Sequence, residues 1–176
     1  MKVSSQSVIT AVSVFAIVIA VSLFATNMAQ AASDTNTQTQ TLTATINSAA
    51  NLTLATDTVT FQPHNPAAMA SIAADENGST VTASATTDSA STVTLTVEAN
   101  TDLTSGDYTI AADNVTFTST GTGYVDGTLS SADPVAVGSW TGPGVHVGTM
   151  SFFLANSFDY NIGTYTATLT YTLVAP

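Results

Sequence analysis

The side chains best suited to acid–base or metal chemistry are two histidines, and neither lies within a recognisable motif. His64 stands in Gln-Pro-His-Asn-Pro and His146 in Gly-Val-His-Val-Gly. A catalytic triad or a metal site needs partners at matched positions, and none stands near either histidine. The flanking prolines predict a loop for His64, and His146 lies at the start of a predicted strand. We expect a structural or solvent-facing role for both, and we predict no catalytic residue, metal ligand or cofactor.

The acidic residues offer calcium chemistry, because Ca²⁺ takes six to eight oxygen ligands. The densest clusters are Asp75-Glu76-Asn77 and the pair Asp102 and Asp107. Neither follows a twelve-residue calcium loop with Gly at its sixth position and Glu at its end. Solvated turn residues explain both clusters equally well. Nothing marks two of the 12 acids as a pair for glycoside hydrolysis, so we do not expect an enzyme.

Trp140 in Gly-Ser-Trp-Thr-Gly-Pro-Gly is the most suggestive residue for binding. A Trp on a glycine-rich loop could stack on a sugar ring, because large rigid aromatic side chains are common at recognition surfaces. Tyr124 and Tyr160 could join it in such a site. The alternative, which we favour, is that Trp140 caps one end of the protein core.

The charge balance excludes several classes of protein. The chain of 176 residues has one Lys or Arg (Lys2), 12 acids and no Cys. A nucleic-acid binder needs basic side chains to displace phosphate counterions, and a phosphate-handling enzyme needs a basic clamp. Disulfide scaffolds and zinc-thiolate sites need Cys. Thr and Ser together account for 53 residues, so polarity comes from hydroxyl groups instead of charge.

The first 31 residues have the pattern of a secretory signal peptide. Lys2 is followed by an uncharged apolar-leaning run from Val8 to Ala25 and by Ala29-Gln30-Ala31, a small-x-small cleavage site. The rival interpretation is a retained membrane anchor, which the length of the run nearly allows. Three hydroxyl side chains in the run and the lack of a basic flank after it favour cleavage. We expect a signal peptide at 1–31, a flexible leader at 32–40, and a secreted or cell-surface protein with no membrane contact after cleavage.

The mature chain shows the alternation of β-strands. From Thr164 to Leu173, apolar residues and Thr alternate strictly, which is the period-two pattern of a half-buried strand. Residues 92–97 and 41–46 alternate in the same way. Glycine-rich turns separate the runs, and residues 67–74 are the one candidate for a short helix. The sequence therefore predicts an all-β, single antiparallel two-sheet sandwich over 41–176. Further strands are expected at 51–56, 58–62, 79–86, 114–120 and 145–154.

Two short motifs in these strands carry a resemblance. Tyr171-Thr172-Leu173 lies near the end of the chain, and Val93-Thr94-Leu95 lies in the middle of the domain. Together they resemble the paired Trp-x-Leu motifs of WxL-domain surface proteins, with both Trp residues replaced; the WxL-like positions are Val93, Leu95, Tyr171 and Leu173. The resemblance implies an immunoglobulin-like or WxL-like sandwich on a cell surface, bound non-covalently to an envelope polymer. The leading expectation is therefore a secreted structural or binding protein.

The C-terminus also resembles pilin subunits of the chaperone–usher and spore-coat-U-like kind. Gly163 is the fourteenth residue from the C-terminus, and an alternating strand follows it. The resemblance implies a filament, in which the N-terminal segment of one copy completes the sandwich of the next. Residues 35–47 could be that donor strand, because Leu42, Ala44 and Ile46 project to one side. The alternative, which we favour, is that they form the first strand of their own sheet. A glycan-binding module is the third expectation.

Overall fold

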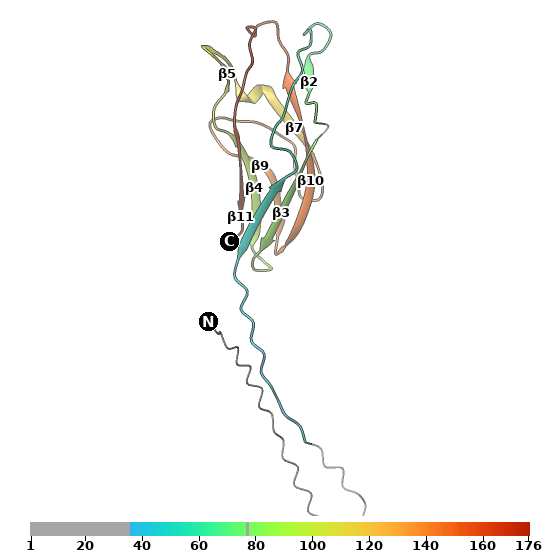
Figure 1. The fold of residues 1–176 in the computed structure, drawn as a ribbon, viewed down its shortest axis with the longest axis vertical. Helices are drawn as coiled ribbons and strands as arrows, with labels where there is room; N and C mark the ends of the chain where they lie inside the picture. Colours follow the sequence, from blue (N-terminus) through green and yellow to red (C-terminus); the bar gives the residue numbers. More distant parts are fainter. Residues whose placement is uncertain (1–35, 77) are drawn as a thin grey trace, which may run out of the picture. The chain divides into compact units, whose positions relative to one another are not determined.

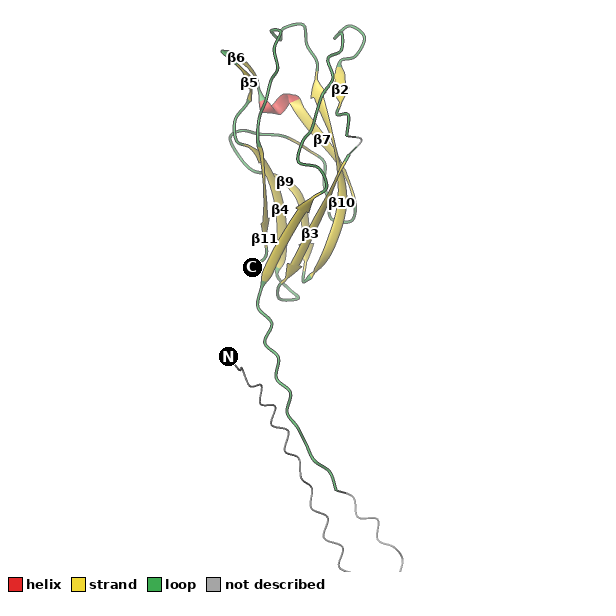
Figure 2. Cartoon of the chain, viewed as in Figure 1, coloured by secondary structure: helices red, strands yellow, loops and turns green. Residues whose placement is uncertain are grey.

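The computed structural model describes residues 36–76 and 78–176. The predicted signal peptide at 1–31 and the first part of the leader lie outside the described residues. The described chain is nearly all β-structure and contains no α-helix (Figure 2). Its elements are β1 (Ala49–Leu54), β2 (Ser71–Ala73), β3 (Ser79–Thr86), β4 (Thr92–Ala99), β5 (Leu103–Ser105), β6 (Tyr108–Ile110), the 3₁₀ helix η1 (Ala112–Asn114), β7 (Val115–Thr120), β8 (Gly127–Thr128), β9 (Val135–Thr141), β10 (Gly144–Ala155) and β11 (Leu169–Val174).

The strands form two packed antiparallel sheets and a small ribbon (Figure 1). The larger sheet has the order β1-β3-β10-β7-β8, and β2 pairs with the end of β10. The smaller sheet has the order β11-β4-β9, and β5 and β6 form the ribbon. The predicted antiparallel two-sheet sandwich is therefore confirmed. Residues Thr43–Pro176 belong to one compact unit, and residues 36–42 lie outside it.

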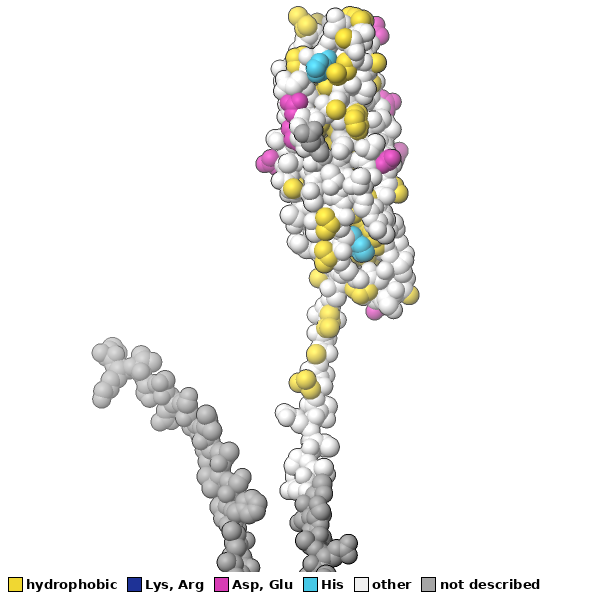
Figure 3. All heavy atoms as spheres, turned by 90° about the vertical axis from the view of Figure 1, so that its right-hand side faces the viewer, with side chains coloured by type: hydrophobic (Ala, Val, Ile, Leu, Met, Phe, Trp, Pro, Cys, Tyr) yellow, Lys and Arg dark blue, Asp and Glu magenta, His cyan; other side chains and the backbone are white. Residues whose placement is uncertain are grey.

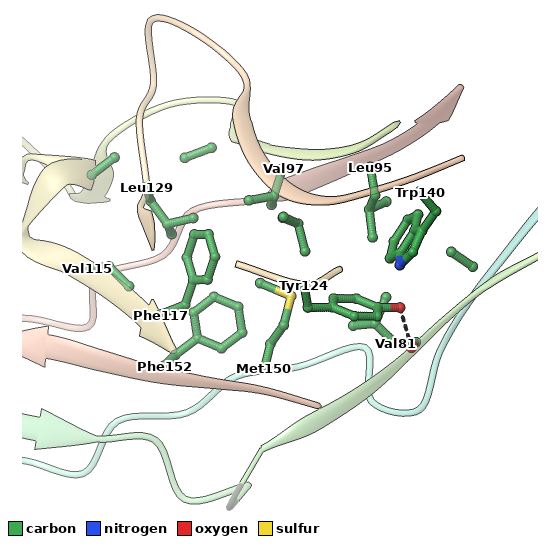
Figure 4. Close-up of a cluster of buried hydrophobic side chains, with 14 of the residues drawn as sticks. Val81, Leu95, Val97, Val115, Phe117, Tyr124, Leu129, Trp140, Met150 and Phe152 are labelled. Atoms are coloured by element: carbon green, nitrogen blue, oxygen red, sulfur yellow. Dashed lines mark hydrogen bonds between the residues drawn. The ribbon is translucent and has the colours of Figure 1, made fainter. Parts of the chain in front are cut away.

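The core lies between the two sheets (Figure 4). Alternate residues of each strand point inward, so that Leu95 of β4 and Phe117 of β7 are almost completely buried. Phe117 pairs with Phe152 of β10 across the larger sheet, and their ring centroids lie 6.0 Å apart. Between these apolar positions, Thr and Ser face outward, and Glu98 is the one acid within a described strand. Thr suits this position because its β-branched side chain fits the pleated surface without charge.

One side of the sandwich is closed by the chain between β7 and β9. Tyr124 forms an isolated bridge to Gly138, and the Val125 and Ser139 amides donate to backbone carbonyls across the same junction. On the opposite side, β1 is the edge of the larger sheet and β11 is the edge of the smaller sheet. Within the described residues, each of these edge strands pairs with a strand on one side only. β1 and β11 contact each other there, but no backbone hydrogen bond joins them, so we call this the open side of the sandwich.

Several predicted elements differ from the structure. Residues 41–46 form no strand, because the first strand begins at Ala49. The segment 58–62 is also not a strand, and the last strand begins at Leu169, after the alternation has already started. Residues 67–74, the helix candidate, form a turn that leads into β2. The helix candidate was therefore wrong. For the three strand predictions the alternation is present, but hydrogen-bonding partners decide whether a strand forms.

Candidate functional site

Trp140 and Tyr124, the candidate stacking residues, belong to the core. Trp140 is 6% exposed and Tyr124 is 8% exposed. The Tyr124 ring packs edge-on against Trp140 at 5.0 Å, and His146 stacks on Trp140 with ring centroids 4.6 Å apart. The Trp140 indole Nε1 donates a hydrogen bond to the Thr122 carbonyl at 2.7 Å. A sugar would have to displace these neighbours, so the predicted stacking role of both residues is not supported.

Tyr124 connects the closing segment to the larger sheet. Its hydroxyl donates to the Val81 carbonyl at 2.9 Å (Figure 4). The His146 carbonyl lies 3.0 Å from the same hydroxyl and shares its proton. Burial raises the pKa of Tyr124, because the ionised ring would lose contact with water. Tyr160, the third candidate, follows the opposite end of β10 and is half-buried. The three rings predicted as a stacking site are therefore not brought together.

Neither histidine lies in a cluster of catalytic or metal-binding side chains among the described residues. His64 is exposed in a loop, where its backbone carbonyl accepts a hydrogen bond from the Asn156 side chain at 3.0 Å. His146 is half-buried against Trp140, and its Nε2 atom has no hydrogen-bond partner among the described residues. No cluster of three or more metal-binding side chains occurs in residues 36–76 and 78–176. No helix in that part of the chain has the length and apolarity needed to cross a bilayer.

One acid from each of the two acidic clusters accepts hydrogen bonds that hold neighbouring loops in place. Glu76 accepts a hydrogen bond from the Thr60 amide at 2.9 Å, and this bond lowers the pKa of its carboxyl group. Asp102 accepts hydrogen bonds from the Ala112 amide at 3.0 Å and from the Ser131 hydroxyl at 2.8 Å. Both bonds lower the pKa of its carboxyl group, and the bond from Ala112 has the larger effect. These bonds favour the ionised carboxylates. Both acids therefore serve local structure.

The four WxL-like positions lie in adjacent strands of the smaller sheet. Val93 and Leu95 are buried in β4, and Tyr171 and Leu173 are half-buried in β11. Leu95 and Leu173 are directly opposite each other in the register. All four side chains pack in or against the core, so none of them is presented on an outer face.

The open side of the sandwich contains a groove, which we call the edge groove. Its volume is about 390 Å³, and it lies between residues 54–61 and residues 165–171. Its floor reaches residues of the core, among them Leu129 and Phe152. Burial raises the pKa of Tyr171 in this groove to about 12. Sequence reasoning missed the groove, although Val59 and Phe61 on one wall and Tyr165 and Ala167 on the other carry an alternating signal.

The segment that precedes β1, residues 36–48, is exposed throughout and forms no strand. Leu42 is 94% exposed and Ile46 is 81% exposed, although both are large apolar side chains. Figure 3 shows hydrophobic side chains spaced along this segment. The predicted strand-exchange residues Leu42, Ala44 and Ile46 therefore remain unburied in the single chain.

Comparisons with protein-family models, with curated proteins and with solved structures found no match. The two features of the described residues that could serve a function are the edge groove and the exposed segment before β1.

Proposed function

We propose that the protein is an exported, non-enzymatic structural subunit that assembles with other copies of itself by donating residues 41–47 as a β-strand. The observation that carries this proposal is the exposure of Leu42 and Ile46 in a segment with strict strand alternation. In an extended strand these two side chains lie on the same face, which is the arrangement that a donated strand presents to its partner. The export of the chain rests on the signal-like pattern of its first 31 residues.

The open sheet edges support this proposal. Natural proteins usually protect an edge strand with Lys, Pro or an inward charge, because its free N–H and C=O groups can pair with another chain. The edge strands β1 (AANLTL) and β11 (LTYTLV) contain no charge and no proline. The chain has no Lys or Arg after Lys2 that could protect them. Two unprotected edges on the same open side suit pairing with an added strand.

The free energy gained by burying the donor side chains and forming ladder hydrogen bonds is comparable to the cost of association. Burying Leu42 and Ile46 contributes about 1.5–3 kcal/mol each. Each ladder hydrogen bond of a donated strand adds about 0.5–1.5 kcal/mol. These gains offset an association cost of about 4–15 kcal/mol only if several ladder bonds form together with the side-chain contacts. A donated strand supplies both, whereas a few surface contacts would not.

Attachment to an envelope polymer, the function implied by the WxL-like resemblance, has less support. Its four positions pack toward the core. Trp140, the aromatic side chain best suited to a sugar, is 6% exposed. Self-assembly accounts for the exposed segment, which polymer binding leaves without a role.

The test is the oligomeric state of the chain produced from Ala32, the expected mature N-terminus. Size-exclusion chromatography with light scattering should give a ladder of oligomers that grows with concentration, and electron microscopy should show linear assemblies. The matched control is the same chain without residues 32–47, which should be monomeric. An intact chain that stays monomeric over a wide concentration range, without fibres, contradicts the proposal.

A further inference from the structure

We infer that the edge groove is the acceptor site for residues 41–47 of a second copy, and that the contact joins opposite ends of the two domains. This inference rests on the proposed function and adds the binding surface and the direction of assembly. Four observations support it: the apolar lining of the groove, its length, its free backbone groups and its position relative to β1.

Most of the surface of the groove is apolar, and Thr and Ser side chains together with Asp57 supply the rest. Phe61, Leu103 and Leu169 line it together with the core residues Phe152 and Leu129. The one charged residue in its lining is Asp57. An apolar and uncharged strand fits such a groove, whereas a charged peptide would lose its hydration without gaining a partner.

The donor segment matches the groove in spacing. Leu42, Ala44 and Ile46 point to one face of an extended strand, at intervals of about 6.6–6.8 Å. From Leu42 to Ile46 the strand would extend about 13 Å. The wall from Tyr165 to Leu169 also covers four residue steps and has the same maximum length.

The wall of the groove also offers unpaired backbone groups. Thr166 exchanges both of its hydrogen bonds with Thr104, at 3.0 Å each, on the side away from β1. In an antiparallel pair, successive residues direct their N–H and C=O groups to opposite sides. Tyr165 and Ala167 therefore direct theirs toward the open side, where no described residue bonds to them. A donated strand would complete this ladder.

The donor and the acceptor lie at opposite ends of the larger sheet. Ala49, where the exposed segment joins β1, lies opposite Thr86 at the end of β3. The groove lies by Leu54 and Ser79, at the other ends of the same two strands. Because two different surfaces meet, the contact is heterologous, and such contacts form open chains unless the rotation closes a ring. We therefore expect head-to-tail chains rather than symmetric dimers.

The absence of Cys from the whole chain makes cross-linking a clean test. One protein carries Ile46→Cys in the donor segment, and a second carries Ala167→Cys in the groove wall. The control acceptor carries Thr172→Cys, which is exposed on the outer face of β11, outside the groove. Ile46, Ala167 and Thr172 are all exposed, so each variant should fold, which circular dichroism can check. The two proteins are mixed under mild oxidation, and mass spectrometry identifies the mixed dimer, which can only form between copies.

The mixed dimer with Ala167→Cys should form at least roughly tenfold faster than that with Thr172→Cys, because docking raises the local concentration of the two thiols. A synthetic peptide of residues 36–48 should suppress it, and the same peptide with serine in place of Leu42 and Ile46 should not. Equal rates for the two acceptors would overturn the groove as acceptor, while oligomers of the unmodified chain would still uphold self-assembly. Monomers of the unmodified chain would overturn both. Cross-linking only within one chain, in a protein carrying both Ile46→Cys and Ala167→Cys, would overturn exchange between copies.

Discussion

Replacing Leu42 and Ile46 with serine should weaken assembly and leave the stability of the isolated domain unchanged. The two side chains are 94% and 81% exposed in the single chain, so their removal takes no contact from the core. In the assembly each is buried in a neighbour, which is worth about 1.5–3 kcal/mol. At 1.4 kcal/mol per factor of ten, each replacement should raise the dissociation constant about 10- to 150-fold. The double variant should lose the sum of the two free energies, provided that the two side chains occupy independent parts of the groove.

The assay has two parts, because assembly and folding must be measured separately. Sedimentation velocity over a range of concentrations gives the dissociation constant. Thermal unfolding, recorded by circular dichroism at a concentration where the protein is monomeric, gives the stability of the domain. The matched control replaces Thr43 and Thr45 with serine, which changes the same segment on its opposite face and should leave both quantities near their original values.

Two results would refute this reasoning. If the double variant unfolds several degrees lower as a monomer, Leu42 and Ile46 contribute to their own domain, and the segment is a strand of its own sheet. If the double variant assembles as tightly as the original chain, the apolar face of the segment does not enter a neighbour. Either result would remove the donor role, whatever the oligomeric state of the protein.

Three further predictions concern the domain itself. Gly123→Ala should lower the free energy of unfolding by about 2–5 kcal/mol, because φ is +84° and the added Cβ would meet the Trp140 ring; Gly106→Ala, with φ of +59° and no atom within 4 Å, should cost about 1–2 kcal/mol in the same thermal unfolding assay. The half-buried Tyr171 has a pKa of about 12 in the folded protein, compared with about 10 when unfolded. The stability that its neutral side chain contributes is therefore complete below pH 10 and is lost as the pH rises to 12. In denaturant titrations the free energy of unfolding should fall by about 3 kcal/mol less over that interval in Tyr171→Phe than in the original chain, and an equal fall in the two proteins would contradict this prediction. Moderate NaCl should raise the melting temperature or leave it unchanged, because the 12 acids repel one another without basic partners, and a clear fall would count against this account.

The strands that the sequence predicted well are those in which buried and exposed residues alternate regularly. The segment 79–86 coincides with β3, and 92–97 lies within β4, because inward and outward residues alternate along them without interruption. β9 was missed for a physical reason. The register slips between Leu95 and Thr96 of its partner strand, and Val137 and Gly138 are both buried in succession. A bulge of this kind breaks the period-two signal, so alternation alone does not find the strand.

The candidate site was less accessible to prediction than the fold. The alternation at 41–46 correctly identified an apolar face, but it contained no information on whether a partner strand exists within the same chain. The groove depends on residues more than a hundred positions apart, such as Phe61 and Leu169. Only the pairing of whole strands brings these residues to the same open side, and a local pattern does not determine that pairing.

A chain with no Lys or Arg after Lys2 has few means of protecting its sheet edges. Among the described acids only Glu98 lies in a strand, so repulsion between copies acts mainly at the ends of the strands and not along the edges. A neutral edge without Lys or Pro would ordinarily favour uncontrolled pairing. Filling the edge groove with one specific segment removes that hazard for the wall from Tyr165 to Leu169, because the donated strand occupies the backbone groups that an unrelated strand would otherwise use. The same contact leaves one free donor and one free groove at the two ends of the chain, so growth continues only in a line. On this argument, the neutral edges and the exposed segment before β1 are two parts of one arrangement, and a variant that fills the groove without offering a donor should stop growth at that end.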